Sequence, residues 1–170
     1  MTIIWQELTA GLPDAEQLLR MSLRLIMAML LGAIIGYERE RIKKPAGLRT
    51  HMLVSMGSAL LVLVPLRAGA SLDDTTRVTQ GVATGIGFIG AGSILKISEQ
   101  HQINGLTTAA GIWVTAAIGL AAGLGQIGIA ILATLCTWLV LRLVTVIDKW
   151  MHHNSKSEPV NPSSDATHDT

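Results

Sequence analysis

A long stretch without charged side chains constrains the fold more than any other feature of this sequence. No Asp, Glu, Lys or Arg occurs from Ile103 to Leu141. A helix needs about 20 mainly apolar residues to cross the hydrocarbon core of a bilayer, so the stretch is long enough for two such helices. A surface helix of a soluble protein would show a polar face at helical spacing, and none occurs here. The stretch therefore predicts an integral membrane protein.

Further apolar segments raise the expected number of spans to about five. The uncharged stretch should break near residues 123–126, where two glycines and an amide favour a tight reversal. Three more helices are expected at about residues 18–37, 51–66 and 78–95. Charged residues form only 15% of the chain, against about 25% in soluble domains. We therefore expect an all-α membrane protein, a polytopic bundle of about five transmembrane helices over residues 18–147.

Basic residues predict the orientation of the bundle. Lys and Arg are enriched in the cytoplasmic loops of membrane proteins, and the loop after the first predicted span is strongly basic. With that loop inside, eight basic residues are cytoplasmic and three are not: Arg39, Arg41, Lys43, Lys44, Arg49, Lys96, Lys149 and Lys156 against Arg20, Arg67 and Arg77. We expect a multi-pass protein of a bacterial inner membrane, with residues 1–17 as a periplasmic interfacial segment and residues 148–170 as a disordered cytoplasmic tail.

Glycine pairs indicate where the helices pack closely. Gly-xxx-Gly spacing, which lets backbones approach in lipid, occurs at Gly32 and Gly36, Gly81 and Gly85, and Gly119 and Gly123. The third predicted span is the richest in glycine, with Gly81, Gly85, Gly87, Gly90 and Gly92. We expect this helix at the centre of the bundle. The alternative is a locally unwound segment lining a polar path with Thr107 and Thr108.

Residues 85–90 match the glycine spacing of a dinucleotide-binding loop, but their context excludes that function. Such a loop needs a preceding strand, and an acidic residue about 20 positions further on. Here the motif lies inside an apolar span, and Asn104 and Gly105 occupy the place of the acid. No nucleotide site is expected.

Polar residues gather where the first two predicted spans flank their basic loop. We name Glu38, Arg39, Arg49, Thr50 and His51 the loop cluster. Arg49 has a planar fork of donors that suits a carboxylate or phosphate, and Glu38 is the nearest acid to orient it. The cluster either forms a binding site for an anion, a lipid head group or a partner, or it only sets topology and caps a helix.

Four motifs carry a resemblance to a known family: Gly32–Arg41, Ala46–His51, Gly85–Gly92, and Gly105–Ala110 with its continuation to Gly119. Together they resemble the MgtC/SapB family of bacterial inner-membrane proteins, over about residues 20–145. Asp74, Arg77 and Gln80 match the acid, arginine and glutamine that precede the glycine-rich span in that family. The resemblance implies a multi-pass protein connected with magnesium limitation or stress adaptation. Some members carry a folded cytoplasmic domain after the last span, which we do not expect here.

Two charged positions on the expected outer side have alternative interpretations. Arg24, within the first span, either extends to the outer surface or pairs with Asp73 or Asp74. Asp74 instead caps the third helix if no such pair forms.

The functional residues of common enzymes are missing from this sequence. It contains no His-Glu-x-x-His or Gly-x-Ser-x-Gly motif, and all its carboxylates fall in loops, termini or helix ends, whereas Mg²⁺ prefers oxygen ligands such as carboxylates. We expect no enzyme activity, catalytic residue, metal site, cofactor or nucleic-acid partner. The favoured function is a modulator that contacts a membrane-protein partner or a second copy within the lipid bilayer; the alternative is a small ion channel or transporter.

Overall fold

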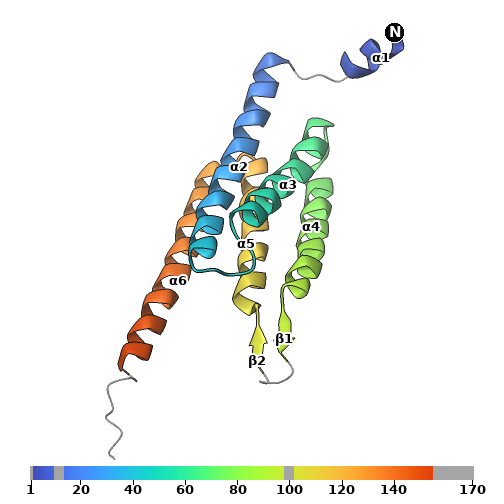
Figure 1. The fold of residues 1–170 in the computed structure, drawn as a ribbon. Helices are drawn as coiled ribbons and strands as arrows, with labels where there is room; N and C mark the ends of the chain where they lie inside the picture. Colours follow the sequence, from blue (N-terminus) through green and yellow to red (C-terminus); the bar gives the residue numbers. More distant parts are fainter. Residues whose placement is uncertain (1, 10–13, 98–101, 155–170) are drawn as a thin grey trace, which may run out of the picture.

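The computed structural model describes residues 2–9, 14–97 and 102–154, most of them in helices (Figure 1). In chain order the elements are α1 (Thr2–Thr9), α2 (Ala15–Arg41), α3 (Leu48–Arg67), α4 (Leu72–Gly92), β1 (Leu95–Ile97), β2 (Gln102–Asn104), α5 (Leu106–Gly123) and α6 (Ile127–Asn154). Helices α2 to α6 correspond in order to the five predicted spans. The chain is an all-α membrane bundle, as predicted.

The long helices differ in how clearly they qualify as membrane spans. Among the described residues, α2, α3 and α5 are each long and apolar enough to cross a bilayer. The described apolar part of α6, Ile127–Leu143, is slightly shorter. Helix α4 begins with Asp73 and Asp74 in its first turn. Its apolar part therefore starts after these charges.

The turn between α5 and α6 falls at the predicted position. Leu124 is the C-cap of α5, and Gly125 follows with a φ of +82°. The amide of Gln126 donates to the Ala121 carbonyl at 2.9 Å, and that of Gly125 donates to the Ala122 carbonyl at 3.0 Å. Glycine adopts this left-handed conformation without strain, so Gly125 ends the helix and allows the chain to reverse.

A short antiparallel strand pair, absent from the sequence-based prediction, joins α4 to α5. Lys96 of β1 pairs with Ile103 of β2, and the register places Leu95 opposite Asn104. The pair directs the chain from the end of α4 back to the start of α5 (Figure 1). Each strand has only three residues, which is too short for an alternating apolar pattern to predict it from the sequence.

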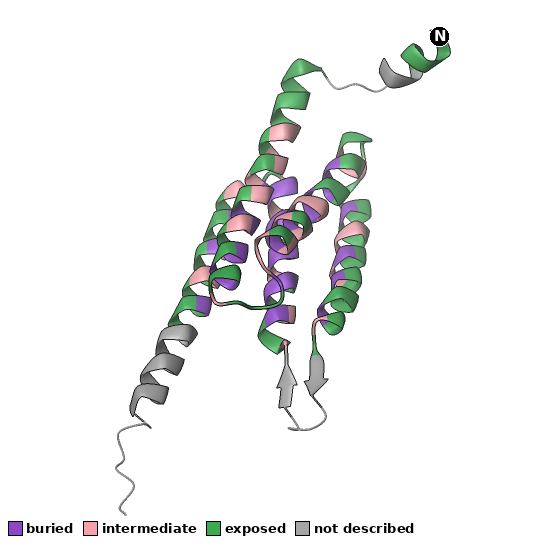
Figure 2. Cartoon of the chain, in the orientation of Figure 1, coloured by how far each residue is buried: buried purple, intermediate pink, exposed green. Residues whose placement is uncertain are grey.

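Helix α5 occupies the centre of the bundle. Its buried residues lie on several sides of the helix and include Ile112, Thr115, Ile118, Gly119 and Ala122. In Figure 2 α5 is largely buried, whereas α4 is mostly exposed. Packing against α2, α3, α4 and α6 accounts for this burial.

Two of the three glycine pairs bring helix backbones into contact. A Cβ built on Gly32 would lie 2.6 Å from the His51 carbonyl oxygen of α3. One built on Gly119 would lie 2.1 Å from the Ser55 carbonyl oxygen, also of α3. Neither position has room for a methyl group. The prediction of close packing is therefore confirmed for α2 against α3 and for α3 against α5.

The predicted central position of the glycine-rich helix is wrong. A Cβ at Gly81, Gly85, Gly87 or Gly92 would meet nothing within 4 Å, and one at Gly90 would meet Ala109 at an ordinary 3.6 Å. The helix is also continuous from Leu72 to Gly92, so it is not unwound. Helix α5 is rich in Ala and Gly and has few polar side chains, so other helices pack on several of its sides and it takes the centre. Helix α4 therefore lies at the edge of the bundle.

The first and last described helices, α1 and α6, extend beyond the bundle (Figure 1). Residues 148–154 continue α6 and are not the disordered chain that was predicted for them, while residues 155–170 of the predicted tail lie outside the described part. At the other end, α1 projects away from the long helices and exposes Ile3, Ile4 and Trp5 (Figure 1). The assignment of residues 1–17 as a periplasmic interfacial segment stays a prediction.

Candidate functional site

The loop between α2 and α3 is held by a carboxylate. Glu40 Oε2 accepts a hydrogen bond from the backbone amide of Leu48 at 2.7 Å. This bond satisfies one of the free N–H groups at the start of α3, where a negative charge is also favoured by the helix dipole. The loop itself turns through Lys43, whose φ is +55°. Glu40 thereby fixes how α2 and α3 meet.

Arg39 is the buried cation of the loop cluster. Its side chain is only 2% exposed, and it reaches from α2 to the first turn of α5, where Nη2 donates to Thr108 Oγ1 at 3.2 Å. Its Nε atom is buried and has no hydrogen-bond partner among the described residues. A buried guanidinium with an unused donor is unusual, because buried polar groups are normally hydrogen-bonded.

His51 is completely buried between α2 and α5. Its Nδ1 lies 2.9 Å from the Gly47 carbonyl oxygen, and because a carbonyl only accepts, Nδ1 must carry the proton. In the neutral ring Nε2 is then an acceptor, and it has no partner among the described residues. A Cβ on Gly111 of α5 would lie 3.6 Å from Nε2. His51 therefore bonds to the N-cap carbonyl of α3 but does not cap the free N–H groups of its first turn.

The predicted pair of Glu38 with Arg49 does not form. Glu38 is buried and accepts from Arg41 at 3.0 Å. Arg49 is exposed, without a hydrogen bond or ion pair to another described residue, and Thr50 is half-buried. Of the loop cluster, the fold brings Glu38, Arg39 and His51 into the interior and leaves the other two near the surface.

Thr107 and Thr108 join Arg39 at a cavity of about 440 Å³ beside the loop. We name it the basic pocket; it is lined by Arg39, Lys43, Lys44, Pro45, Gly105, Leu106, Thr107 and Thr108. A sequence signal for Arg39 did exist. Arg39 lies about one helical turn beyond Gly36, on the same buried face of α2 as Ala28 and Gly32. It is the first polar residue on that face after the apolar region, and it faces α5.

The three residues proposed for the outer side stay apart from the rest of the site. Asp74 forms a capping box with Ser71: its backbone amide donates to the Ser71 hydroxyl at 3.2 Å, and its carboxylate accepts from the Ser71 amide at 3.1 Å. Arg77 and Gln80 are exposed on α4. Of the two alternatives for Asp74, helix capping is the one that the structure shows.

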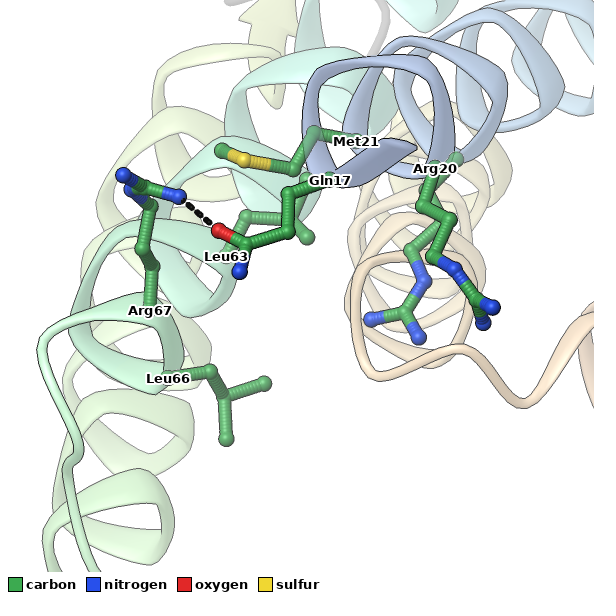
Figure 3. A pocket seen from close by; sticks show the side chains of 7 residues that line it. Gln17, Arg20, Met21, Leu63, Leu66 and Arg67 are labelled. Atoms are coloured by element: carbon green, nitrogen blue, oxygen red, sulfur yellow. Dashed lines mark hydrogen bonds between the residues drawn. The ribbon is translucent and has the colours of Figure 1, made fainter. Parts of the chain in front are cut away.

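Arg24 does not form the predicted pair with Asp73 or Asp74. Its Nη1 donates to the Gly123 carbonyl oxygen at 3.1 Å, at the C-terminal end of α5, where a positive charge suits the helix dipole. It lines a cavity of about 330 Å³ together with Arg20 and Arg67. Figure 3 shows this cavity, with Arg67 of α3 donating to Gln17 of α2. The two exposed arginines at this cavity both bond within the protein: Arg67 donates to Gln17, and Arg20 pairs with Glu16.

An apolar groove of about 620 Å³ separates α3 from α4. Its lining includes two of the open glycines of α4, Gly81 and Gly85, and Gly57 of α3. The rest of the lining is apolar or small: Leu53, Val54, Ser58, Leu61, Val78, Val82, Ile86 and Ile89. Within a bilayer this groove faces lipid or another helix.

Comparison with known proteins identifies close relatives. SrpB of Synechococcus elongatus is 47% identical over 141 residues, which is 76% of this chain and 77% of SrpB. YhiD of Escherichia coli K12, by its name a candidate magnesium transporter, is 48% identical over 128 residues, or 71% of this chain and 59% of YhiD. MgtC of Salmonella typhimurium LT2 is 44% identical over 123 residues, or 71% of this chain and 52% of MgtC.

The matches agree with the motifs noted in the sequence. The chain spans little more than half the length of YhiD and MgtC. No solved structure matches it significantly. The profile of the MgtC family matches residues 25–150, from the middle of α2 to α6. This chain is a member of the MgtC family.

Proposed function

We propose that the chain is a non-enzymatic modulator of a membrane complex, acting in adaptation to magnesium limitation or related stress in a bacterial inner membrane. The magnesium connection is supported by the names of its relatives YhiD and MgtC. The modulator role is supported by the charge of the buried polar groups and by the open face of α4.

The observation that carries the proposal is the positive charge buried at the loop end of the bundle. Mg²⁺ sites are built from carboxylates and retained waters. At this end the guanidinium of Arg39 is buried, and the buried carboxylate, Glu38, is paired with Arg41. The described residues contain no group of three potential acidic, histidine or cysteine ligands for a metal ion. The buried positive charge would repel a Mg²⁺ ion that moved along these side chains.

The face of α4 supports a role in helix contacts. Small residues promote association of membrane helices because they let backbones approach. Gly81 and Gly85 offer such a surface and are not covered by any described part of the chain. A second copy or a helix of another membrane protein would fit against it.

The alternative function is a small ion channel or transporter, which the name of YhiD favours. Liposomes containing the purified chain should separate the two. If the chain is a modulator, Mg²⁺ flux should equal that of protein-free liposomes. Flux that depends on the protein and saturates with Mg²⁺ would reject the modulator proposal.

Helix contact is tested by growth and co-purification with matched variants. Gly85→Leu fills the open face of α4, and Gly128→Leu adds the same side chain at an equally open position on α6. Growth under magnesium limitation and retention of the same membrane partner in mild detergent should both be lost with Gly85→Leu and kept with Gly128→Leu. Equal behaviour of the two variants would contradict a contact through α4.

We further propose that the loop between α2 and α3 is cytoplasmic. In a Cys136→Ala background, Lys44→Cys should resist an impermeant thiol reagent in intact cells, whereas Ala68→Cys, in the turn between α3 and α4, should react. Both positions are exposed. The reverse labelling pattern would invert the orientation.

A further inference from the structure

The basic pocket carries a strong positive charge without acidic side chains to balance it. Arg39, Lys43 and Lys44 line it, and none of the eight lining residues is acidic. The acids closest in sequence are engaged elsewhere: Glu38 with Arg41, and Glu40 with the backbone amide of Leu48. Three positive charges around one cavity favour an anion.

The N-terminus of α5 opens onto the same pocket. Its N-cap is Gly105, which has no side chain to accept from the first-turn amides. A larger residue does not fit there, because φ is +100° and a Cβ would lie 2.0 Å from the Ser93 carbonyl oxygen. The free amides of the first turn and the positive end of the helix dipole are therefore available to a ligand.

Arg39 supplies independent evidence for a missing ligand. It is 98% buried by area, since only 2% of its surface is exposed, and it lines the pocket with Nε unpartnered. Its single hydrogen bond to a described residue goes to Thr108, which also lines the pocket. Burial of a guanidinium with so little compensation is costly unless an anion pairs with it.

We propose that the basic pocket binds a phosphate group, supplied either by the head group of an anionic phospholipid or by a soluble phosphate. A tetrahedral anion with several oxygens can accept from the Arg39 fork, from the two lysines and from the threonine hydroxyls at once. The amides at the start of α5 add further donors. The site does not depend on whether the protein is a modulator or a transporter.

Two binding measurements on the full chain in nonionic detergent distinguish the two sources. Native mass spectrometry compares retention of phosphatidylglycerol with that of phosphatidylcholine of the same chain length. Thermal unfolding compares inorganic phosphate with chloride at equal ionic strength. A lipid site gives selective retention of phosphatidylglycerol, and a soluble-phosphate site gives a rise in Tm with phosphate. Either result supports the pocket if it also depends on the pocket lysines.

Paired variants test that dependence without touching the buried arginine. Lys44→Gln removes a charge that lines the pocket, and Arg49→Gln removes an exposed charge from the same region outside it. Lys43→Asn suits the positive φ at that position. We expect several-fold weaker binding with Lys44→Gln, about tenfold weaker binding with both lysines replaced, and no change with Arg49→Gln. Equal effects of Lys44→Gln and Arg49→Gln, or no selectivity in the wild-type chain, would overturn the proposal.

Discussion

Helices α4 and α5 carry the same glycine spacing and use it in opposite ways. Gly119 and Gly123 of α5 touch the backbone of α3, so that built Cβ atoms would lie 2.1 Å from the Ser55 oxygen and 2.6 Å from the Ala59 oxygen. Gly81 and Gly85 of α4 face open space. One pair closes an interface within the chain, and the other leaves a surface for a neighbour.

Small residues on both helices permit close packing but do not enforce it. The side of α3 that faces α5 presents Ser55 and Ala59, both of which are buried. The side of α3 that lines the apolar groove presents Gly57 and Ser58 as well, with the larger Leu53 and Leu61 beside them. The groove stays open although both helices offer small residues there, so glycine spacing alone does not close a contact between two helices.

The largest expected effect is at the α3–α5 contact. Gly119→Ala places a methyl group against the Ser55 backbone, which cannot move without separating the helices. We expect a loss of at least about 1–3 kcal/mol of stability, measured as a lower Tm in detergent. Gly85→Ala, the same change at an open position, should not lower Tm. Equal losses would show that α4 is packed in the membrane as tightly as α5.

A smaller effect is expected at the polar contact beside it. Ser55 Oγ donates to the Ala28 carbonyl of α2 at 2.6 Å, in the buried interior. Ser55→Ala should cost about 1 kcal/mol, as is typical for a hydrogen bond between membrane helices. Thr84→Ala on α4 is the control, because the Thr84 hydroxyl donates within its own helix, to the Gln80 carbonyl. Thermal unfolding that ranks the two variants in the opposite order would contradict this account.

The smallest effect on the single chain is expected at Phe88, which is 83% exposed on α4. Phe88→Ala should change the free energy of unfolding by no more than about 0.5 kcal/mol, as for surface substitutions, and so leave Tm in detergent nearly unchanged. If α4 meets a second copy or a partner, the same variant should weaken that complex in a crosslinking assay of native membranes. A large loss of Tm in the isolated chain would show that Phe88 is packed within it.

Several features of the site were within reach of the sequence, and others were not. The short basic loop implied that residues on its two sides approach one another, and Arg39 and His51 do lie at that end. The bond from Arg39 to Thr108 joins residues 69 positions apart. No local pattern predicts such a bond, because it depends on α5 packing against both α2 and α3.

Helix number and helix ends were determined by the sequence itself. Apolar runs and turn residues act locally: Gly125 ends α5 through its own backbone conformation, and Ser71 with Asp74 caps α4 through neighbouring groups. The tertiary structure alone decided which glycine pair is buried and which arginine is enclosed. Arg39 and Arg49 flank the same loop, but the contact of Gly36 with Leu48 sets the rotation of α2 against α3. That rotation turns Arg39 toward α5 and leaves Arg49 at the surface.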